Sequence, residues 1–283
     1  MNGEKLKNKI KKRAKEIGAQ PQELMQMYFF ERLLYRISIS RYKFNFILKG
    51  GLLLSAIIGD ERRTTSDMDT IIKGIDIESD ELLRIIQEII NIETDDNISF
   101  EIEKAKDIRI DDIYGGVNVK LIAKKDGLIV PLFIDITTKD PITPREIEFK
   151  YKSLFDDTYI KIMAFNKETI IAEKFETLIK DTETNTRAKD FYDLYIIIKD
   201  YWNDLDKTNL IKAIQNTCKR RDSLYILDEI EERFDFIKES NILQNEWNKY
   251  KIAHLYAKDI EYADIMKNIN LIIEELEKEV AII

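Results

Sequence analysis

Glycine and proline are distributed very unevenly along this chain of 283 residues. All 9 glycines and all 4 prolines occur before residue 145, and the last of them is Pro144. Both residue types interrupt helices, glycine through backbone entropy and proline through its missing N–H. A long segment that lacks both, and whose apolar residues recur at helical spacing, is expected to be all helical. We therefore expect the architecture to change within an irregular stretch at 140–165, with a domain boundary after residue 150.

The first part of the chain mixes two periodicities. Apolar residues recur at helical spacing over 79–92, whereas apolar and polar residues alternate over 98–102 and 117–123. A turn at 124–127 then leads into a further strand over 128–137. Helices interleaved with strands, and strands joined by hairpins, favour an α/β (α+β) fold with a mixed sheet. The expected organisation is N-terminal helices packing on the core (1–43), a sheet core (44–150) and a helical C-terminal domain (151–283).

The composition excludes several classes of protein. A single cysteine, Cys218, rules out an internal disulfide framework, and a single histidine, His254, argues against a zinc site. No leader or membrane span is visible in the sequence, so we expect a cytoplasmic monomer. The net charge of −8 argues against a generally basic nucleic-acid coat protein. Basic clusters at 5–15 and 219–221 are either phosphate-binding patches or solvated helix faces.

The densest chemical signal lies in residues 46–72. An apolar run ends at Gly50-Gly51, a helix-like segment follows, and a polar loop leads to Asp67 and Asp69 at the start of a strand. Alternate side chains of a strand share a face, so the two carboxylates point the same way. A hard cation such as Mg²⁺ relieves their repulsion and commonly bridges carboxylates to substrate phosphates. Glycines that begin a helix let backbone N–H groups approach an anion. Together these features predict a metal–triphosphate site.

Each of these motifs has a structural alternative, because a Gly-Gly pair is usually a turn and a lone D-x-D usually lies in a solvated loop. The functional interpretation is favoured because the acids lie between apolar runs, and because residues 62–66 (RRTTS) place cations and hydroxyls directly before them. Asp135 lies among apolar residues in the strand over 128–137, where a buried carboxylate needs a partner. If that strand lies beside the one carrying Asp67, Asp135 becomes a third metal ligand or a base. The alternative is an ordinary carboxylate facing water.

Two predicted helices of the C-terminal half carry charged residues in or beside their apolar stripes. Lys174 lies three residues after one apolar position and four before another, so it needs an anion, either a carboxylate or a substrate phosphate. On the next helix, Arg187 and Asp190 share a flank, and Lys189 is spaced to pair with Asp193. Antiparallel packing could bring Lys174, Arg187 and Asp190 to one cleft. The alternative is ordinary ion pairs on helix surfaces.

Three segments, taken in order, resemble the AbiEii/AbiGii toxin family, which comprises nucleotidyltransferases of bacterial type IV abortive-infection and toxin–antitoxin systems and includes the mycobacterial MenT group. They are 49–55 (KGGLLLS), the loop and acids over 62–69, and 173–194, and the resemblance spans about 44–200. It implies a DNA-polymerase-β-like nucleotidyltransferase core and a helical C-terminal domain, with the active site between them. One departure is that polymerase-β-type enzymes usually have Gly-Ser before the helix, whereas here the first hydroxyl is that of Ser55.

The resemblance also implies a reaction and partners. A nucleotide would pass from an NTP to an acceptor, in some relatives the 3′ end of tRNA, stopping translation, and a cognate antitoxin would restrain the toxin. The alternatives are transfer of a nucleotide or phosphate to a protein, or a non-catalytic module that binds NTP or antitoxin. The acceptor oxygen would attack the α-phosphorus in line, assisted by Mg²⁺ or Mn²⁺.

Residue roles follow from the resemblance together with the residue patterns. Thr65 stands where a hydroxyl contacts the nucleotide and where some relatives are neutralised by phosphorylation. The expected catalytic residues are Asp67, Asp69, Lys174, Asp190 and Asp135. The expected metal ligands are Asp67, Asp69 and Asp135. The expected nucleotide-binding residues are Lys49, Gly50, Gly51, Arg63, Thr65, Ser66, Arg187 and Lys189.

Overall fold

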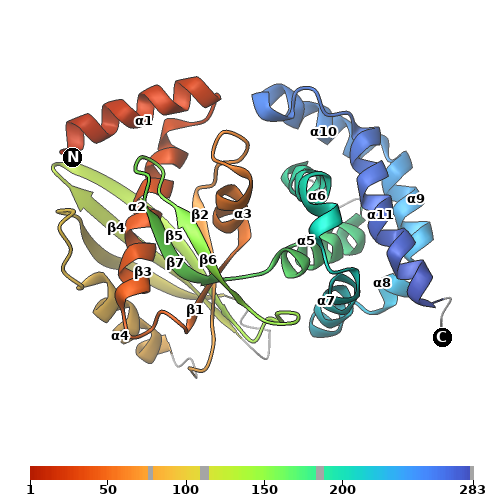
Figure 1. The fold of residues 1–283 in the computed structure, drawn as a ribbon, viewed down its shortest axis with the longest axis horizontal. Helices are drawn as coiled ribbons and strands as arrows, with labels where there is room; N and C mark the ends of the chain where they lie inside the picture. The colour runs from red at the N-terminus through yellow and green to blue at the C-terminus, as the bar shows by residue number, and fades with distance from the viewer. Residues whose placement is uncertain (76–78, 109–114, 183–187, 281–283) are drawn as a thin grey trace. The chain divides into compact units, whose positions relative to one another are not determined.

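The computed structural model describes residues 1–75, 79–108, 115–182 and 188–280, and it contains two compact units (Figure 1). The sheet unit comprises Met1–Asp140 and Glu146–Phe165, and the helical unit comprises Pro141–Arg145 and Asn166–Ile283. Arg187, one of the predicted nucleotide-binding residues, lies outside the described residues.

One seven-stranded sheet forms the centre of the sheet unit, with strand order β3-β4-β5-β2-β1-β7-β6. β2 pairs in parallel with β5, and β1 pairs in parallel with β7, whereas the other neighbouring pairs are antiparallel. The predicted mixed sheet is therefore confirmed. The strands are β1 Phe46–Lys49, β2 Asp67–Ile72, β3 Ser99–Ile108, β4 Gly116–Lys125, β5 Leu128–Thr138, β6 Ile147–Lys152 and β7 Tyr159–Ala164.

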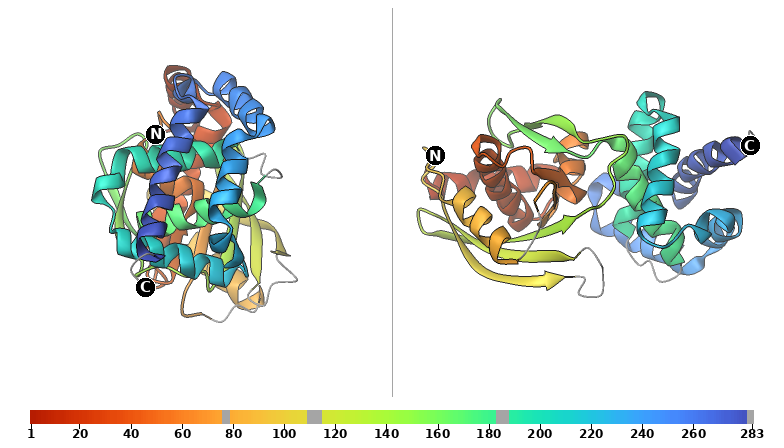
Figure 2. Two further views of the ribbon diagram at one scale, coloured as in Figure 1. Left: turned by 90° about the vertical axis from the view of Figure 1, so that its right-hand side faces the viewer. Right: turned by 90° about the horizontal axis from the view of Figure 1, so that it is seen from below.

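Three helices pack on one side of this sheet, and a fourth packs on one of them (Figure 2). α2 (Pro21–Ile39) packs on β5 and β7 and also contacts α1 (Gly3–Ile17) and α4 (Ser79–Ile90). The apolar stripe of α1 is narrow, and its members Leu6 and Ile10 are buried against the rest of the unit. α3 (Gly50–Ile58) follows β1 directly and contacts both β1 and β2. The helices thus supply the apolar partner that one face of the sheet requires.

The two faces of β5 are buried very differently. Leu132 and Ile134 are fully or almost fully buried on the helix-covered side. The residues between them in sequence point the other way, and Ile129 and Phe133 remain 68% and 40% exposed. The side of β5 that carries Asp135 is therefore the side that the three helices do not cover.

Residues 140–165 were expected to be irregular, and this expectation is wrong for 147–152 and 159–164, which form strands. β6 and β7 form an antiparallel pair there, and β7 also joins β1 in parallel. Ile160, Ile162 and Ala164 alternate with exposed or half-buried residues, which is the pattern of a half-buried strand. The predicted boundary after residue 150 consequently falls inside the sheet unit, which extends to Phe165.

From Asn166 onward, each regular element that the structure describes in the helical unit is a helix, as the absence of glycine and proline from this part of the chain predicts. The first is α5, which is capped by Asn166 through a hydrogen bond from the backbone N–H of Thr169. No helix in the described ranges combines the length and apolar character needed to cross a membrane. The elements are α5 Lys167–Asp181, α6 Ala188–Tyr201, η2 Trp202–Asp204, α7 Lys207–Arg220, α8 Tyr225–Asp228, α9 Ile230–Glu239, α10 Asn241–Ala253, η3 Leu255–Ala257 and α11 Tyr262–Val280.

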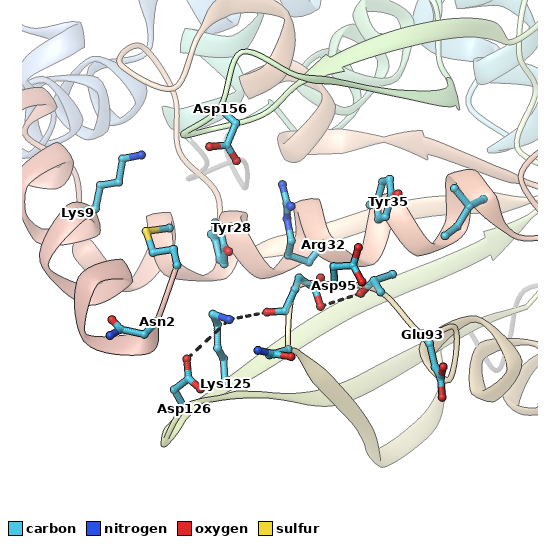
Figure 3. Close-up of a pocket in the computed structure, with 15 residues that line it drawn as sticks. Asn2, Lys9, Tyr28, Arg32, Tyr35, Glu93, Asp95, Lys125, Asp126 and Asp156 are labelled. Atoms are coloured by element: carbon cyan, nitrogen blue, oxygen red, sulfur yellow. Dashed lines mark hydrogen bonds and ion pairs between the residues drawn. The ribbon is translucent and has the colours of Figure 1, made fainter.

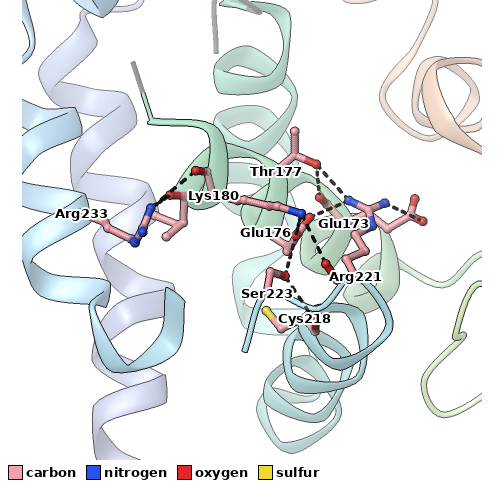
Figure 4. A network of polar contacts seen from close by, with 9 residues as sticks. Glu173, Glu176, Thr177, Lys180, Cys218, Arg221, Ser223 and Arg233 are labelled. Atoms are coloured by element: carbon pink, nitrogen blue, oxygen red, sulfur yellow. Dashed lines mark hydrogen bonds and ion pairs between the residues drawn. The ribbon is translucent and has the colours of Figure 1, made fainter. Parts of the chain in front are cut away.

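A buried carboxylate ties α5 to the end of α7 (Figure 4). Glu176 is 1% exposed, accepts a hydrogen bond from Ser223 Oγ at 2.7 Å and pairs with Arg221 at 2.7 Å. Arg221 also pairs with Glu173 at 3.4 Å. This arginine of the basic cluster at 219–221 therefore serves to compensate a buried charge.

Candidate active site

The strand that carries the two predicted metal ligands lies at the centre of the sheet. β2 is flanked by β1 and β5, and Asp69 is the register partner of Lys49 on one side and of Asp135 on the other. Asp67 lies two residues earlier on the same face. All three carboxylate side chains are half-buried. The sequence-based condition for Asp135 is met, because its strand is the direct neighbour of β2.

Asp69 leans over the first glycine of the diglycine. Gly50 has φ +64°, a left-handed conformation that glycine adopts without the cost imposed by a Cβ atom. A Cβ atom at this position would lie 1.9 Å from Asp69 Oδ2, far inside the van der Waals limit. The start of α3 and the carboxylate of Asp69 therefore fit together only because residue 50 has no side chain.

The second glycine lies against the loop that precedes β2. A Cβ atom on Gly51 would lie 2.7 Å from Thr65 Oγ1 and 3.1 Å from Arg63 Nη2. The hydroxyl of Thr65 in turn donates a hydrogen bond to Asp67 Oδ1. The loop, the helix start and both acids of β2 thus converge in one place, which joins six of the predicted site residues.

Buried polar contacts hold this loop in position. Ser55 Oγ donates to the backbone carbonyl of Arg63, and Thr64 Oγ1 donates to Glu23 of α2. Arg63 is 2% exposed and donates to the carbonyl of Thr64. The hydroxyl of Ser55 is thus engaged by the loop. Ser66 is exposed at the end of the loop, directly before β2.

Lys49 is buried beside the acids and is paired with a further carboxylate, that of Asp140. Its ammonium lies 2.8 Å from Asp140 Oδ2, which also accepts a hydrogen bond from Thr137 Oγ1 at 2.8 Å. Lys49 also lies over the ring of Phe165, 5.4 Å from its centroid. Its proposed contact with a nucleotide stays a prediction.

The acids supply only oxygen donors, and two of them accept hydrogen bonds from neutral groups. Asp135 Oδ1 accepts from Asn118 Nδ2 of β4, and Asp67 accepts from Thr65. Oxygen donors of this kind suit a hard divalent cation. Within the described ranges, no group of three or more histidine, cysteine, aspartate or glutamate side chains is already gathered to hold a metal. The three-carboxylate ligand set therefore stays a prediction.

In the helical unit, Lys174 of α5 lies between two carboxylates of α6. Its ammonium is 2.8 Å from Asp190 Oδ1 and 2.7 Å from Asp193 Oδ2. Asp193 has no exposed side-chain surface. Lys174 lies beside Asp190, as expected. It also pairs with Asp193, a residue that the sequence analysis had considered only as a partner of Lys189. The motif Lys189-Asp190-x-x-Asp193, with two acids three residues apart on one helix face, was the signal available for it.

A separate cavity of about 870 Å³ lies in the sheet unit beside α2 (Figure 3). Its lining combines Tyr28, Arg32 and Tyr35 of α2 with the start of α1, the loop 93–97 and the turn after β4. Acids and bases are mixed along its walls, and it includes none of the predicted catalytic or nucleotide-binding residues. It is therefore distinct from the cluster around Asp69.

The chain was compared with solved structures and with known sequences. The structure resembles the crystal structure of JHP933 from Helicobacter pylori with a TM-score of 0.51 and 18% identity, over 93% of this chain and 96% of that one. It is less similar to an antigenic nucleotidyltransferase-like protein from Paracoccidioides brasiliensis, with a TM-score of 0.40 and 16% identity over 69% and 91% of the two chains. No curated protein sequence matches the chain.

Residues 32–268, which make up most of the chain, match the family described as "Nucleotidyl transferase AbiEii toxin, Type IV TA system". This match includes the diglycine, the acids of β2 and β5, and the lysine–aspartate cluster of α5 and α6. The chain therefore belongs to the AbiEii family of nucleotidyltransferase toxins from type IV toxin–antitoxin systems.

Proposed function

We propose that this nucleotidyltransferase uses Mg²⁺ or Mn²⁺ to transfer a nucleotide from an NTP to the 3′ acceptor end of tRNA, which blocks translation. The observation that carries the proposal is the approach of Asp69 to Gly50, where a Cβ atom would be 1.9 Å from the carboxylate. It brings a negatively charged group against the start of a helix, where backbone N–H groups are suited to bind phosphate. A cation would compensate the carboxylate, and a triphosphate would accept hydrogen bonds from the N–H groups at the start of the helix.

The donor chemistry fits a divalent metal held by Asp67 and Asp69, with Asp135 as a further oxygen donor. Asp67 and Asp135 accept hydrogen bonds from neutral groups, so their negative charge is still available to a cation. When bound, such a cation would offset charge on the phosphates and lower the pKa of the acceptor hydroxyl.

The reaction proposed is an in-line displacement. The acceptor hydroxyl oxygen forms a bond to the α-phosphorus, the bond from that phosphorus to the oxygen bridging the β-phosphate breaks, and pyrophosphate leaves. The hydroxyl proton passes to Asp135 or to water. Arg63 neutralises phosphate charge, because preorganised positive groups stabilise the charge that develops in the transition state.

The test incubates the purified chain with each labelled NTP and Mg²⁺, together with total tRNA or with cell protein. Label in tRNA, with release of pyrophosphate, is expected for the native chain and not for Asp67→Asn. Asp157→Asn, which changes a fully exposed carboxylate, is the matched control and should transfer normally. Label in protein instead of tRNA would show that the acceptor is a protein. Nucleotide binding without release of pyrophosphate would show that the chain is a non-catalytic binding module.

We also propose that phosphorylation of Thr65 neutralises the toxin. Its hydroxyl bonds to Asp67 and lies beside Gly51, so a phosphoryl group there would place about two negative charges among the acids and fill the space meant for substrate. Intact mass after coexpression with the cognate antitoxin should show one added phosphate, absent from Thr65→Val. An unmodified mass for a fully inhibited toxin would exclude this route of control.

A further inference from the structure

The uncovered face of β3, β4 and β5 has a composition unlike an ordinary solvated sheet. Strand register places Lys120 opposite Phe133 and Lys124 opposite Ile129, and it places Lys104 on β3 opposite Lys120. Directly paired residues point to the same side, so these side chains form one surface. Its central members, here called the open face, are Lys104, Lys106, Lys120, Lys124, Ile129 and Phe133.

Large apolar side chains are exposed on the open face. Ile129 is 68% exposed and Phe133 is 40% exposed, and Lys120 lies over the Phe133 ring, 5.8 Å from its centroid. Burying these groups elsewhere would be favourable, so their exposure needs a reason. An aromatic ring beside a lysine offers a base a surface to stack on and its phosphate a countercharge.

The lysines are only partly compensated. Lys120 pairs with Glu103, and Lys124 pairs with Glu101. Lys104 and Lys106 are exposed and have no ion-pair partner within the described ranges. The open face therefore keeps positive charge on a chain whose total charge is −8. Local charge of this kind is what directs a polyanion to one place on an acidic protein.

The open face runs directly into the proposed active site. Phe133 is the register partner of Asp67, and Asp135 lies two residues farther along the same face of β5. From Ile129 to Asp135 the strand covers about 20 Å, at about 3.3 Å per residue. A length of this size accommodates a few nucleotides of an extended single strand, with the terminal hydroxyl at the acids.

We propose that the open face binds the single-stranded 3′ end of the RNA acceptor, with a base stacked on Phe133 and backbone phosphates near Lys104 and Lys106. This inference rests on the proposed function, because it gives the acceptor of that reaction a path to Asp67. A single strand is favoured over a duplex because only unpaired bases expose a face to an aromatic side chain.

The test measures binding of a fluorescein-labelled single-stranded RNA octamer and of deacylated tRNA to the full chain carrying Asp67→Asn, which prevents turnover. Phe133→Ala should weaken both on the order of tenfold, and Phe133→Trp should restore binding. Lys104→Ala with Lys106→Ala should reduce the slope of log affinity against log salt by roughly 0.7 for each phosphate that these lysines neutralise in the parent.

A matched control exists in the same unit. Lys43 lies over the ring of Phe44, 4.5 Å from its centroid, and Phe44 is 61% exposed, so Lys43→Ala and Phe44→Ala remove an equivalent lysine–aromatic pair outside the open face. These two variants should bind RNA as the parent does. If these control substitutions weakened RNA binding as much as the substitutions of Phe133, Lys104 and Lys106 do, the proposal would be overturned.

Further outcomes separate this inference from the proposed function. Transfer to tRNA that persists with an unchanged KM for tRNA in Phe133→Ala would overturn the inference and leave the function intact. A rise in the KM for NTP, with RNA affinity unchanged, would also overturn it by assigning the ring to the incoming nucleotide. Loss of antitoxin binding without loss of RNA binding would do the same, because the open face would then be a protein-docking surface.

Discussion

Asp67 and Asp135 in the sheet unit accept hydrogen bonds from neutral groups, whereas Asp190 and Asp193 in the helical unit share the ammonium of Lys174. The first arrangement keeps negative charge available to a ligand. The second compensates its charge internally, which is required where Asp193 has no contact with water. Carboxylates with neutral partners are therefore expected to contribute mainly to catalysis. A buried carboxylate that is paired with a lysine is expected to contribute to stability as well.

The largest effect on activity is expected at the acids of β2. Asp67→Asn or Asp69→Asn should lower the transfer rate by about 10³-fold or more, because each removes charge that the reaction requires. The melting temperature of Asp67→Asn should stay the same or rise, because Asp67 accepts from a neutral hydroxyl and like charges repel across the face. Rates under saturating NTP and thermal melts of the same preparations measure both. A loss of activity that tracks a loss of stability would remove the distinction between the two units.

Lys174→Met tests the expectation that the charge cluster of the helical unit contributes to stability. The substitution removes the ammonium that pairs with the buried Asp193, which should cost about 3–5 kcal/mol of unfolding free energy. Urea unfolding of the variant, and of Lys174→Met combined with Asp193→Asn, should show the double variant recovering part of that free energy. Lys278→Met, which breaks an exposed pair with Glu275, is the control and should unfold like the parent. An unchanged midpoint for Lys174→Met would contradict the assignment.

The importance of the fit between Gly50 and Asp69 can be tested by comparing two glycines that both have positive φ. Gly50→Ala should reduce activity by about 10²-fold, because the new Cβ atom displaces the carboxylate. Gly127→Ala, at φ +82° with nothing within 4 Å, should cost about 1 kcal/mol of stability and leave activity unchanged. Steady-state kinetics and chemical unfolding separate the two costs. Equal loss of activity in both would show that backbone strain alone is responsible.

The smallest effect is expected at Cys218, which reports on the integrity of the helical unit. Burial, followed by the charge of Glu176, raises the pKa of its thiol to about 11. Since the thiolate is the reactive form, labelling by iodoacetamide at pH 8 should be very slow in the native protein and complete in urea. Lys174→Met should speed native-state labelling, and Asp67→Asn should not. Rapid labelling of the parent would mean that α7 opens without unfolding.

Local patterns in the sequence predicted much of the sheet unit. The segment DMDTII was expected to be a strand and forms β2, and the turn at 124–127 joins β4 to β5. The convergence of Gly50 with Asp69 could be proposed because a helix start after β1 and alternation along β2 each fix a direction. The missed elements did carry a local signal. β6 alternates apolar and charged residues, and β7 does so in part, as half-buried strands do, but each is only 6 residues long.

Partners that lie far apart in sequence could not be assigned from spacing. Asp193 pairs with Lys174 on another helix, a partner that its spacing from Lys189 could not reveal. Lys49 was expected to face a nucleotide, and the structure gives it Asp140 as a partner across 91 residues. Helical and strand periodicities define a face and a direction. The identity of the opposing residue depends on how elements pack, which no single segment encodes.

The central place of β2 has a consequence for how such a toxin can be switched off. Both edges of β2 are hydrogen-bonded, to β1 and to β5, so its backbone is released only when the sheet itself comes apart. Fraying of an end or movement of a surface loop would leave the spacing of its acids unchanged. We therefore expect inhibition to come from occlusion or covalent alteration of a folded, fully assembled enzyme, and activity to return as soon as the obstruction is removed.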